Sequence, residues 1–265
     1  PVSVTGPDGR ITTTEYGLLR STVTDPGGHK KITVTDVFGK QVETREVIDG
    51  QELLIARITY DVRMLPIMVE DAAGNQTNTV FDSLGNRISL HEPNAGSSTY
   101  EYDVLGRMTA SVNAAGERTE HSYDALGRTT MVVAGVGSAN ESTVTSIYDE
   151  PREGYHNVGR GTSQSSDAAT IYVDYDESGN PVRHRKVIED TTYTLTATYD
   201  AAGAMITKTD PDGETLGPMQ YNAVGQLIAI PGVLTDAQYD ASGRITQRTL
   251  ANGVVTNDTY DPASG

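Results

Sequence analysis

The chain has 265 residues, with 27 Gly, 14 Tyr, no Cys and no Trp, and its formal net charge at pH 7 is −16. The acidic charge argues against binding to nucleic acid or to an anionic membrane, and the missing cysteines exclude a disulfide framework. No apolar run reaches the roughly 18 residues of a transmembrane helix, and no signal peptide is visible. The length suffices for one large all-β domain or two smaller ones. Because the sequence begins at Pro1, we expect a processed product or an excised fragment.

One phrase recurs along the chain. Tyr102-Asp103-Val104-Leu105-Gly106-Arg107 returns 21 residues later as Tyr123-Asp124-Ala125-Leu126-Gly127-Arg128. Ten of the 14 tyrosines open a copy of this phrase, so the repeat indicates one supersecondary unit used many times. The twelve candidate copies begin at Tyr16, Thr35, Tyr60, Phe81, Tyr102, Tyr123, Tyr148, Tyr175, Tyr199, Tyr221, Tyr239 and Tyr260.

The residue types of the phrase predict a turn between two strands. Asp can accept hydrogen bonds from backbone N–H groups two or three residues on, and Gly takes the positive φ that reverses the chain. Tyr closes the preceding strand, and stacked tyrosines would form a ladder worth about 0.5–1.5 kcal/mol per aromatic pair. The predicted structural repeat residues are Tyr102, Asp103, Gly106, Arg107, Tyr123, Asp124, Gly127, Arg128, Tyr175, Asp176, Gly179, Tyr239, Asp240 and Gly243.

A second class of turn lies halfway between the copies. Two turns in each repeat leave two strands of about 6–8 residues, which predicts an all-β antiparallel meander. The modest apolar content favours a thin sheet over a compact sandwich with a dry core. These turns are expected at Gly6–Gly9, Asp25–Gly28, Asp71–Gly74, Glu92–Gly96, Asn113–Gly116, Asp210–Gly213 and Asn252–Gly253.

The pattern breaks in three places. The copy Tyr60–Pro66 lacks its Gly, so its turn is expected to be different or absent. Glu150–Thr170 is rich in Gly, Ser and charge, and we interpret it as a protruding, mobile loop. A milder excursion spans Ala134–Ser142. Because no shift in composition marks a boundary, we expect residues 1–265 to form a single YD-repeat region of about twelve units.

Catalytic and metal sites have little support in the sequence. The histidines (His29, His91, His121, His156 and His184) lack zinc-site spacing, and no GxSxG, GxxxxGK[ST] or HExxH motif occurs. Asp8, Asp210 and Asp212 lie in turns and could ligate calcium, although none fits an EF-hand loop. We therefore expect no enzymatic activity, no cofactor and no metal. Two tyrosines off the repeat position, Tyr155 and Tyr172, are candidate interaction residues that could bind sugars.

The recurring YDxxGR phrase, with its Gly-Arg openings and DPxG or NxxG mid-turns, resembles the Rhs/YD-repeat family from about Tyr16 to Gly265. This family includes bacterial Rhs polymorphic toxins, the B and C components of insecticidal toxin complexes, and animal teneurins. The resemblance implies YD-repeat hairpins that form a curved sheet or part of a spiral β-shell. In the bacterial toxins such a shell encloses a C-terminal toxin, and in teneurins it is an adhesion scaffold.

Two features depart from the toxin pattern. Asp210–Gly213 matches only the first part of the DPxGL motif near the toxins' self-cleavage site, and we interpret it as a mid-repeat turn. The ending Tyr260–Gly265 resembles the YDPxxG that opens the toxins' core segment, but no protease can be assigned to it. A chain of this length would make about one turn of a shell.

The resemblance implies a structural segment of a shell or scaffold that encapsulates a toxin or cargo for secretion and delivery. The alternative is an extracellular adhesion or glycan-binding module. The implied partners are the remainder of a longer Rhs-type polypeptide, its toxin cargo, or a cell-surface glycan or protein, and the implied location is secreted or cell surface. Exposed sheet edges predict either capping by other segments of a longer chain or self-association.

Overall fold

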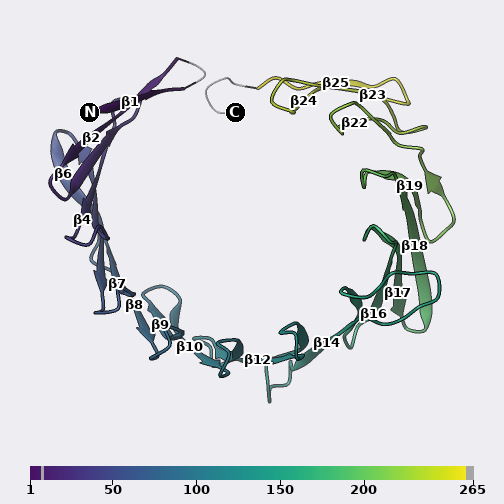
Figure 1. Cartoon of the computed structure of the whole chain (residues 1–265), viewed down its shortest axis with the longest axis horizontal. Helices are drawn as coiled ribbons and strands as arrows, with labels where there is room; N and C mark the ends of the chain where they lie inside the picture. The colour runs from purple at the N-terminus through teal and green to yellow at the C-terminus, as the bar shows by residue number, and fades with distance from the viewer. Residues whose placement is uncertain (7–8, 261–265) are drawn as a thin grey trace. The chain divides into compact units, whose positions relative to one another are not determined.

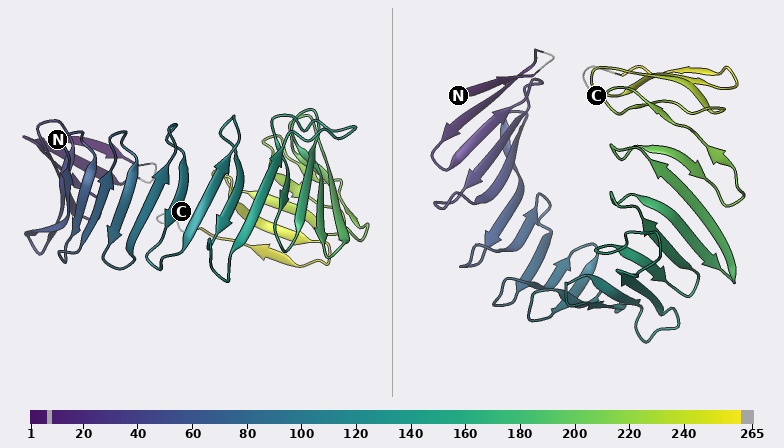
Figure 2. Two further views of the ribbon diagram at one scale, coloured as in Figure 1. Left: turned by 90° about the horizontal axis from the view of Figure 1, so that it is seen from below. Right: turned by 45° about the vertical axis from the view of Figure 1, so that its right-hand side comes forward.

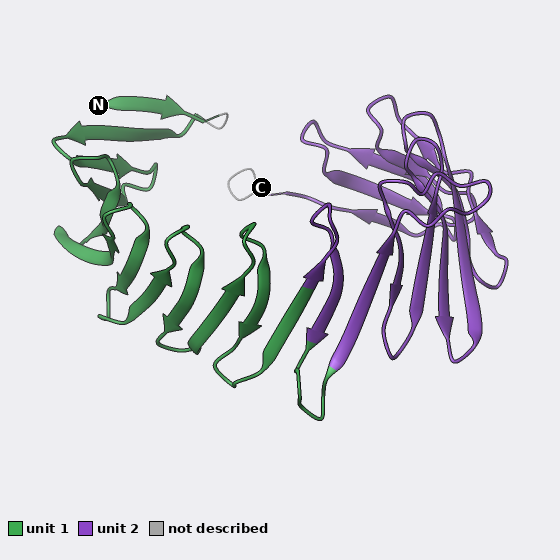
Figure 3. Ribbon diagram, turned by 60° about the horizontal axis from the view of Figure 1, so that its bottom comes forward, with its two compact units in different colours: residues 1–121, 134–141 green, residues 122–133, 142–265 purple. Residues whose placement is uncertain are grey.

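The structure is a computed structural model that describes residues 1–6 and 9–260 (Figure 1). All regular elements in these residues are β-strands, which confirms the all-β expectation, and no helix among them could cross a membrane. The chain divides into two compact units, residues 1–121 with 134–141 and residues 122–133 with 142–265 (Figure 3).

Each strand of the first unit pairs antiparallel with the next strand in the sequence, so the predicted meander is confirmed there. Figure 2 shows these strands side by side with alternating directions. The strands are β1 (Val2–Thr5), β2 (Ile11–Gly17), β3 (Arg20–Thr24), β4 (Lys30–Thr35), β5 (Gln41–Ile48), β6 (Gln51–Tyr60), β7 (Pro66–Asp71), β8 (Gln76–Phe81), β9 (Arg87–Glu92), β10 (Gly96–Tyr102), β11 (Met108–Val112) and β12 (Arg118–Tyr123), whose last two residues belong to the second unit.

The second unit continues the same pattern of consecutive antiparallel pairs from β14 to β20 and then forms two short sheets, β21 with β22 and β23 to β25. Its strands are β13 (Thr129–Ala134), β14 (Ser142–Tyr148), β15 (Gly161–Ser165), β16 (Thr170–Tyr175), β17 (Pro181–Ile188), β18 (Thr191–Tyr199), β19 (Met205–Thr209), β20 (Thr215–Leu216), β21 (Gln220–Tyr221), β22 (Leu227–Ala229), β23 (Leu234–Tyr239), β24 (Ile245–Leu250) and β25 (Val255–Asn257).

The repeat turns share one hydrogen-bond arrangement. The backbone N–H of Asp103 donates to the carbonyl of Arg107 (2.9 Å), and that of Gly106 donates to the carbonyl of Asp103 (3.0 Å). Oδ1 of Asp103 accepts the N–H groups of Leu105 and Arg107, both at 2.9 Å. Gly106 has a φ of 78°, in the left-handed region that favours glycine. Asp103 thus caps the turn and Gly106 reverses the chain, which are the roles expected from the sequence.

The mid-repeat turns use the same arrangement. In the turn that starts at Asp71, the N–H of Asp71 donates to the carbonyl of Asn75 (3.0 Å) and the N–H of Gly74 to the carbonyl of Asp71 (3.1 Å). The turn Asp210–Gly213 joins β19 to β20 in this way, so its interpretation as a mid-repeat turn is confirmed. The two turn classes of the sequence therefore share one arrangement, except at Glu92–Gly96, where Glu92 and Gly96 pair as strand residues.

The turn of the copy at Tyr60 is present, so the expectation that it would be different or absent is wrong. Asp61 accepts the N–H groups of Arg63 (2.8 Å) and Leu65 (3.0 Å) through Oδ1, as the other turn aspartates do. Met64 occupies the glycine position with a φ of 64°. The carboxylate of Asp61 thus holds a side-chain-bearing residue in a conformation that costs about 1–2 kcal/mol.

Two hairpins have turns that belong to neither of the two turn classes expected from the sequence. Asp49-Gly50 joins β5 to β6, and Glu189-Asp190 joins β17 to β18. All four residues have positive φ, between 45° and 77°, as in a two-residue turn whose twist matches that of the strands. Asp-Gly suits this turn, whereas Glu-Asp carries two side chains into it.

A β-bulge lies beside most repeat turns, with its extra residue in the strand that follows the turn. Glu101 pairs with Ala110 but Tyr102 pairs with Met108, which leaves Thr109 as the extra residue. The register shifts in the same way before Tyr60, Phe81, Tyr148, Tyr175, Tyr199, Tyr221 and Tyr239. A bulge bends the strand and increases its twist, so each of these repeats adds a similar local bend.

The sheet has almost no apolar core. Among the described residues, only four apolar side chains are buried, namely Ile32, Ala110, Ala197 and Ala237. This agrees with the thin sheet expected from the modest apolar content. Backbone ladders and the side-chain links between repeats must therefore supply much of the order.

Candidate functional site

The repeat tyrosines join neighbouring repeats through their hydroxyl groups. Tyr102 Oη donates to the carbonyl of Arg87 (2.9 Å), and Tyr148 Oη donates to that of Thr129 (2.9 Å). In every case the acceptor is the first residue of the strand that follows the preceding repeat turn. The other pairs are Tyr60 with Gln41, Tyr175 with Gly161, Tyr199 with Pro181, Tyr221 with Met205, Tyr239 with Leu227, and Tyr260 with Ile245.

Arginines of the turns cover several of these rings. The guanidinium of Arg128 lies 4.3 Å from the ring centre of Tyr148, and that of Arg244 lies 4.4 Å from Tyr260. The sequence predicted tyrosines stacked on one another, but in these repeats the stacking partner is a cation, because the turn arginine reaches the ring of the next repeat. Such a contact contributes about 0.5–1 kcal/mol at an exposed site.

One repeat turn is split by an insertion. Asp149 opens it and Gly159-Arg160 closes it, with nine residues between Asp and Gly where Asp103 and Gly106 have two. The N–H of Asp149 still donates to the carbonyl of Arg160 (3.0 Å), and Gly159 has a φ of 82°. Arg160 also lies 5.2 Å from the ring of the next repeat tyrosine, Tyr175. The copy that begins at Tyr148 is therefore a complete repeat whose Gly-Arg was hidden by the inserted residues.

The expected loop over Glu150–Thr170 is much smaller in the structure. Gly161–Ser165 forms β15, which pairs with both β14 and β16, so the prediction is wrong for these residues. Their Gly and Ser content suggested a loop, yet a strand with partners on both sides tolerates small residues. The milder excursion is confirmed, since residues 135–141 connect β13 to β14.

The insertion is anchored by a buried cluster of charged and polar side chains. Asp174, on β16, is fully buried and accepts hydrogen bonds from Arg152 Nη1 (2.6 Å) and Arg183 Nε (2.7 Å). Asn157 is also buried, and its Nδ2 donates to Asp174 Oδ1 and to the carbonyl of Glu150, both at 3.1 Å. The insertion is thus bound to the sheet by its own Arg and Asn.

The cluster favours the ionised form of Asp174. Burial acts to raise the pKa of this carboxyl, but hydrogen bonds from Arg152, Asn157 and Arg183 outweigh it and hold the pKa below its ordinary value. Arg152 is shared with a second carboxylate, since its Nη2 lies 2.7 Å from Glu150 Oε2. Two arginines and two carboxylates therefore balance each other in this cluster.

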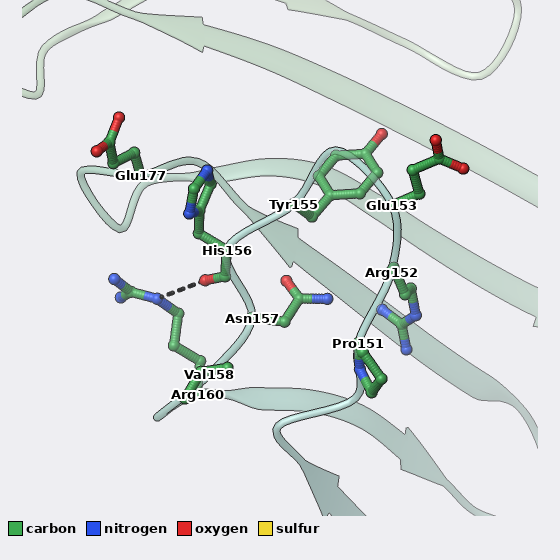
Figure 4. Close-up of a pocket in the computed structure, with 9 residues that line it drawn as sticks. All are labelled: Pro151, Arg152, Glu153, Tyr155, His156, Asn157, Val158, Arg160 and Glu177. Carbon is green, nitrogen blue, oxygen red and sulfur yellow. Dashed lines mark hydrogen bonds between the residues drawn. The ribbon is translucent and has the colours of Figure 1, made fainter.

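An open hollow of about 570 Å³ lies at the insertion (Figure 4). Arg160 lines it, and its Nε donates to the carbonyl of His156 (3.2 Å). The lining combines apolar surface with charges of both signs, so the hollow has no single electrostatic preference. It is lined by Pro151, Arg152, Glu153, Tyr155, His156, Asn157, Val158, Arg160 and Glu177.

The structure places both candidate interaction tyrosines beside arginines of the buried cluster. Tyr155 lines the hollow, and the guanidinium of Arg183 lies 4.4 Å from its ring centre. The ring of Tyr172 contacts Arg152 at 5.3 Å and Arg185 at 4.7 Å. Sequence reasoning missed Arg152, Asn157, Asp174 and Arg183. The sequence did contain one signal for the cluster: Asp174 lies directly before the repeat tyrosine Tyr175, at a position inside a strand.

The other predicted residues lie in ordinary parts of the sheet. Tyr123, Tyr175 and Tyr239 end β12, β16 and β23, as Tyr102 ends β10, and Gly127, Gly179 and Gly243 have φ values between 81° and 94°. Asp124 and Asp240 cap their turns through the following arginines, and Asp176 caps its turn through Asn180. Asp8 and the final copy beyond Tyr260 lie outside the described residues.

Metal ligands are not gathered anywhere in residues 1–6 and 9–260, where no group of three His, Asp or Glu side chains could hold an ion. Of the remaining calcium candidates, Asp210 binds Lys208 Nζ at 2.8 Å, and Asp212 lies at the exposed tip of the same turn. The histidines are dispersed, with His156 at the hollow and His29 bound to Asp25 (2.9 Å).

These features define a class of protein: an antiparallel β-meander built from YD-type turns and joined by tyrosine hydroxyls. A family model described as RHS Repeat matches residues 81–118, and the resemblance to the Rhs/YD-repeat family is thereby confirmed. No curated protein matches the sequence.

Solved structures share the fold over almost the whole chain. The crystal structure of TcdB2-TccC3-Cdc42 has a TM-score of 0.83 at 17% identity, over 99% of this chain and 16% of that one. The crystal structure of TcdB2-TccC3 has a TM-score of 0.82 at 18% identity, over 99% and 16%. The Photorhabdus luminescens Tc holotoxin pore has a TM-score of 0.82 at 17% identity, over 98% and 15%. This chain thus spans about a sixth of the length of the chains that it matches.

Proposed function

We propose that the chain is a structural segment of a β-sheet shell or scaffold, in which a longer polypeptide encloses a toxin or another cargo for secretion and delivery. The observation that carries the proposal is the likeness to TcdB2-TccC3-Cdc42 over 99% of the chain, with a TM-score of 0.83. The location that follows is outside the producing cell, either secreted or at the cell surface.

The geometry of the repeat suits a wall better than a reaction site. The turn aspartates are occupied by backbone N–H groups, the repeat tyrosines by carbonyl oxygens, and the cluster arginines by carboxylates. Each of these side chains has an interaction partner within the sheet. The turn aspartates and the repeat tyrosines also recur at successive chain reversals. This distribution supports a structural role, and we infer that the chain itself is not an enzyme.

The test is a protection experiment on the full product of the gene that encodes this chain. The purified protein is treated with a nonspecific protease, and any segment outside the repeat region is followed by mass spectrometry. We expect an enclosed segment to be digested at least tenfold more slowly than the same segment expressed alone. Particles imaged by electron microscopy should be hollow. A solid particle, or equal digestion rates, would refute the proposal.

A second candidate is an adhesion or glycan-binding module, and the feature in its favour is the open hollow beside Tyr155. Sugar rings bind to aromatic faces, but Arg183 already lies 4.4 Å from the ring centre of Tyr155. Binding on a glycan array that is lost in both Tyr155→Ala and Tyr172→Ala would favour this function. Absence of binding would leave the shell as the better proposal.

A further inference from the structure

The repeat turns at one edge of the first unit carry a row of exposed apolar side chains. In a meander, the turns after β2, β4, β6, β8 and β10 all lie at the same edge. Their tips bear large apolar residues that are between 73% and 97% exposed. We call these residues the apolar rim: Leu18, Val37, Phe38, Val62, Leu84, Val104 and Leu105.

The opposite edge of the same sheet provides an internal comparison. The turns after β3, β5, β7, β9 and β11 are centred on small or polar residues, namely Pro26-Gly27, Asp49-Gly50, Ala72-Ala73, Asn94-Ala95 and Ala114-Ala115. The turns at Ala72-Ala73 and Ala114-Ala115 have the same backbone hydrogen bonds as the repeat turns at the other edge. The turn fold alone therefore does not require large apolar tips, and large exposed apolar side chains gathered along one edge indicate a contact site.

The turn tips of the apolar rim are evenly spaced. Successive tips are separated by two strands, or about 10 Å, so that five turns extend over about 40 Å. Two open hollows lie beside the tips. One of about 380 Å³ is lined by Leu19 and Val37 together with Arg20 and Asp36. One of about 570 Å³ is lined by Leu84 and Val104 together with the carboxylates of Asp82, Glu101 and Asp103. A surface with tips at one regular spacing can interdigitate with a second surface that has the same spacing.

We propose that the apolar rim is an interface between two copies of this chain, in which the turn tips of each copy enter the hollows of the other. A two-fold axis makes one self-complementary patch sufficient for such a dimer. Burying a Val or Leu side chain removes about 60–120 Å² of apolar surface. The seven side chains then remove about 400–800 Å² from each copy, up to the roughly 800 Å² per partner of a stable interface.

The charge of the chain sets the expected salt dependence. Two copies that each carry −16 repel one another, whereas the apolar contact depends little on salt. Association at the rim should therefore strengthen when salt screens the repulsion. An interface made mainly of ion pairs would weaken under the same change. This interface does not depend on the proposed enclosure of a cargo, because it concerns only the chain itself.

Sedimentation velocity on the 265-residue chain tests the interface, at about 5–200 µM protein and at 50 and 500 mM NaCl. We expect a monomer–dimer equilibrium that strengthens with salt. In the double variant Leu84→Gln with Val104→Gln, the dissociation constant should rise at least tenfold while the melting temperature is unchanged. The control variant Ala73→Gln with Ala115→Gln, at the opposite edge, should associate like the wild type.

The edge strand β1 is the rival route to association, because its outer backbone groups can pair with another sheet. The variant Ser3→Pro removes one outward-facing backbone donor there and should leave dimerisation intact if the rim is the interface. A wild-type chain that stays monomeric at 200 µM would overturn the proposal and point to another occupant of the rim. Association that is lost in Ser3→Pro but kept in the rim variant would also overturn it.

Discussion

Removing the charge of Asp174 should destabilise the second unit more than any other single conservative change. In Asp174→Asn, the shape of the side chain is kept, but Arg152 and Arg183 lose the carboxylate that lies 2.6 Å and 2.7 Å from them. Both arginines have restricted access to water, with side chains 15% and 28% exposed. Breaking a buried ion pair from one side costs about 3–5 kcal/mol, and the remaining access to water favours the lower end, about 3 kcal/mol.

Urea unfolding followed by circular dichroism at pH 7 measures this loss. With a slope of about 1–2 kcal/mol per molar urea, the midpoint for the second unit should fall by roughly 1.5–3 M. The matched control is Asp176→Asn in the next turn. Asn113 and Asn222 already cap equivalent turns, so this control should cost less than about 1 kcal/mol.

The pH dependence gives a second check on the same variant. The folded pKa of Asp174 lies below the unfolded value of about 3.9, so its stabilising effect is present above pH 4 and is lost as the pH falls through the folded pKa. The difference in stability between wild type and Asp174→Asn should therefore shrink below pH 4. A loss under 1 kcal/mol at pH 7, or a difference that stays constant down to pH 2, would refute the account of the cluster.

Three other changes have expected outcomes in the same urea assay. Met64→Gly relieves a positive φ in the turn and should stabilise the first unit by about 0.5–1 kcal/mol; destabilisation would show that the Met side chain contributes more than the strain. Asp190→Gly should stabilise the second unit by a similar amount, since its φ is 64° in a two-residue turn, and no gain would contradict that reason. Tyr148→Phe removes the hydroxyl that binds Thr129 and should cost about 0.5–1.5 kcal/mol; a neutral result would mean that water replaces this bond fully.

The recurring turn was predictable because its chemistry is local. Asp103 and Gly106 lie within four residues of every group they bind, so one phrase contains both the cap and the positive φ. The position of each Tyr at a strand end also followed from the phrase. Its acceptor did not, since the carbonyl of Arg87 is 15 residues from Tyr102 and becomes a neighbour only through the strand register.

The cluster at the insertion was hidden for a related reason. Asp174 and Arg152 are 22 residues apart in the chain, and they meet only because the insertion folds back onto β16. The split turn was missed because the inserted residues separate Asp149 from Gly159-Arg160, which matches the end of the phrase. Met64 was misjudged because the rule that the turn needs Gly ignored how strongly Asp61 fixes the backbone.

The hydroxyl links have a consequence for how such chains change length. Tyr148 reaches back to Thr129, and Tyr239 to Leu227, so these hydroxyl links join each repeat to its immediate predecessor. Stability in such an array is close to a sum of nearest-neighbour terms. Duplicating or deleting one whole repeat then leaves every remaining link with an equivalent partner. Recombination within the gene can therefore lengthen or shorten the wall one repeat at a time without a new hydrophobic core.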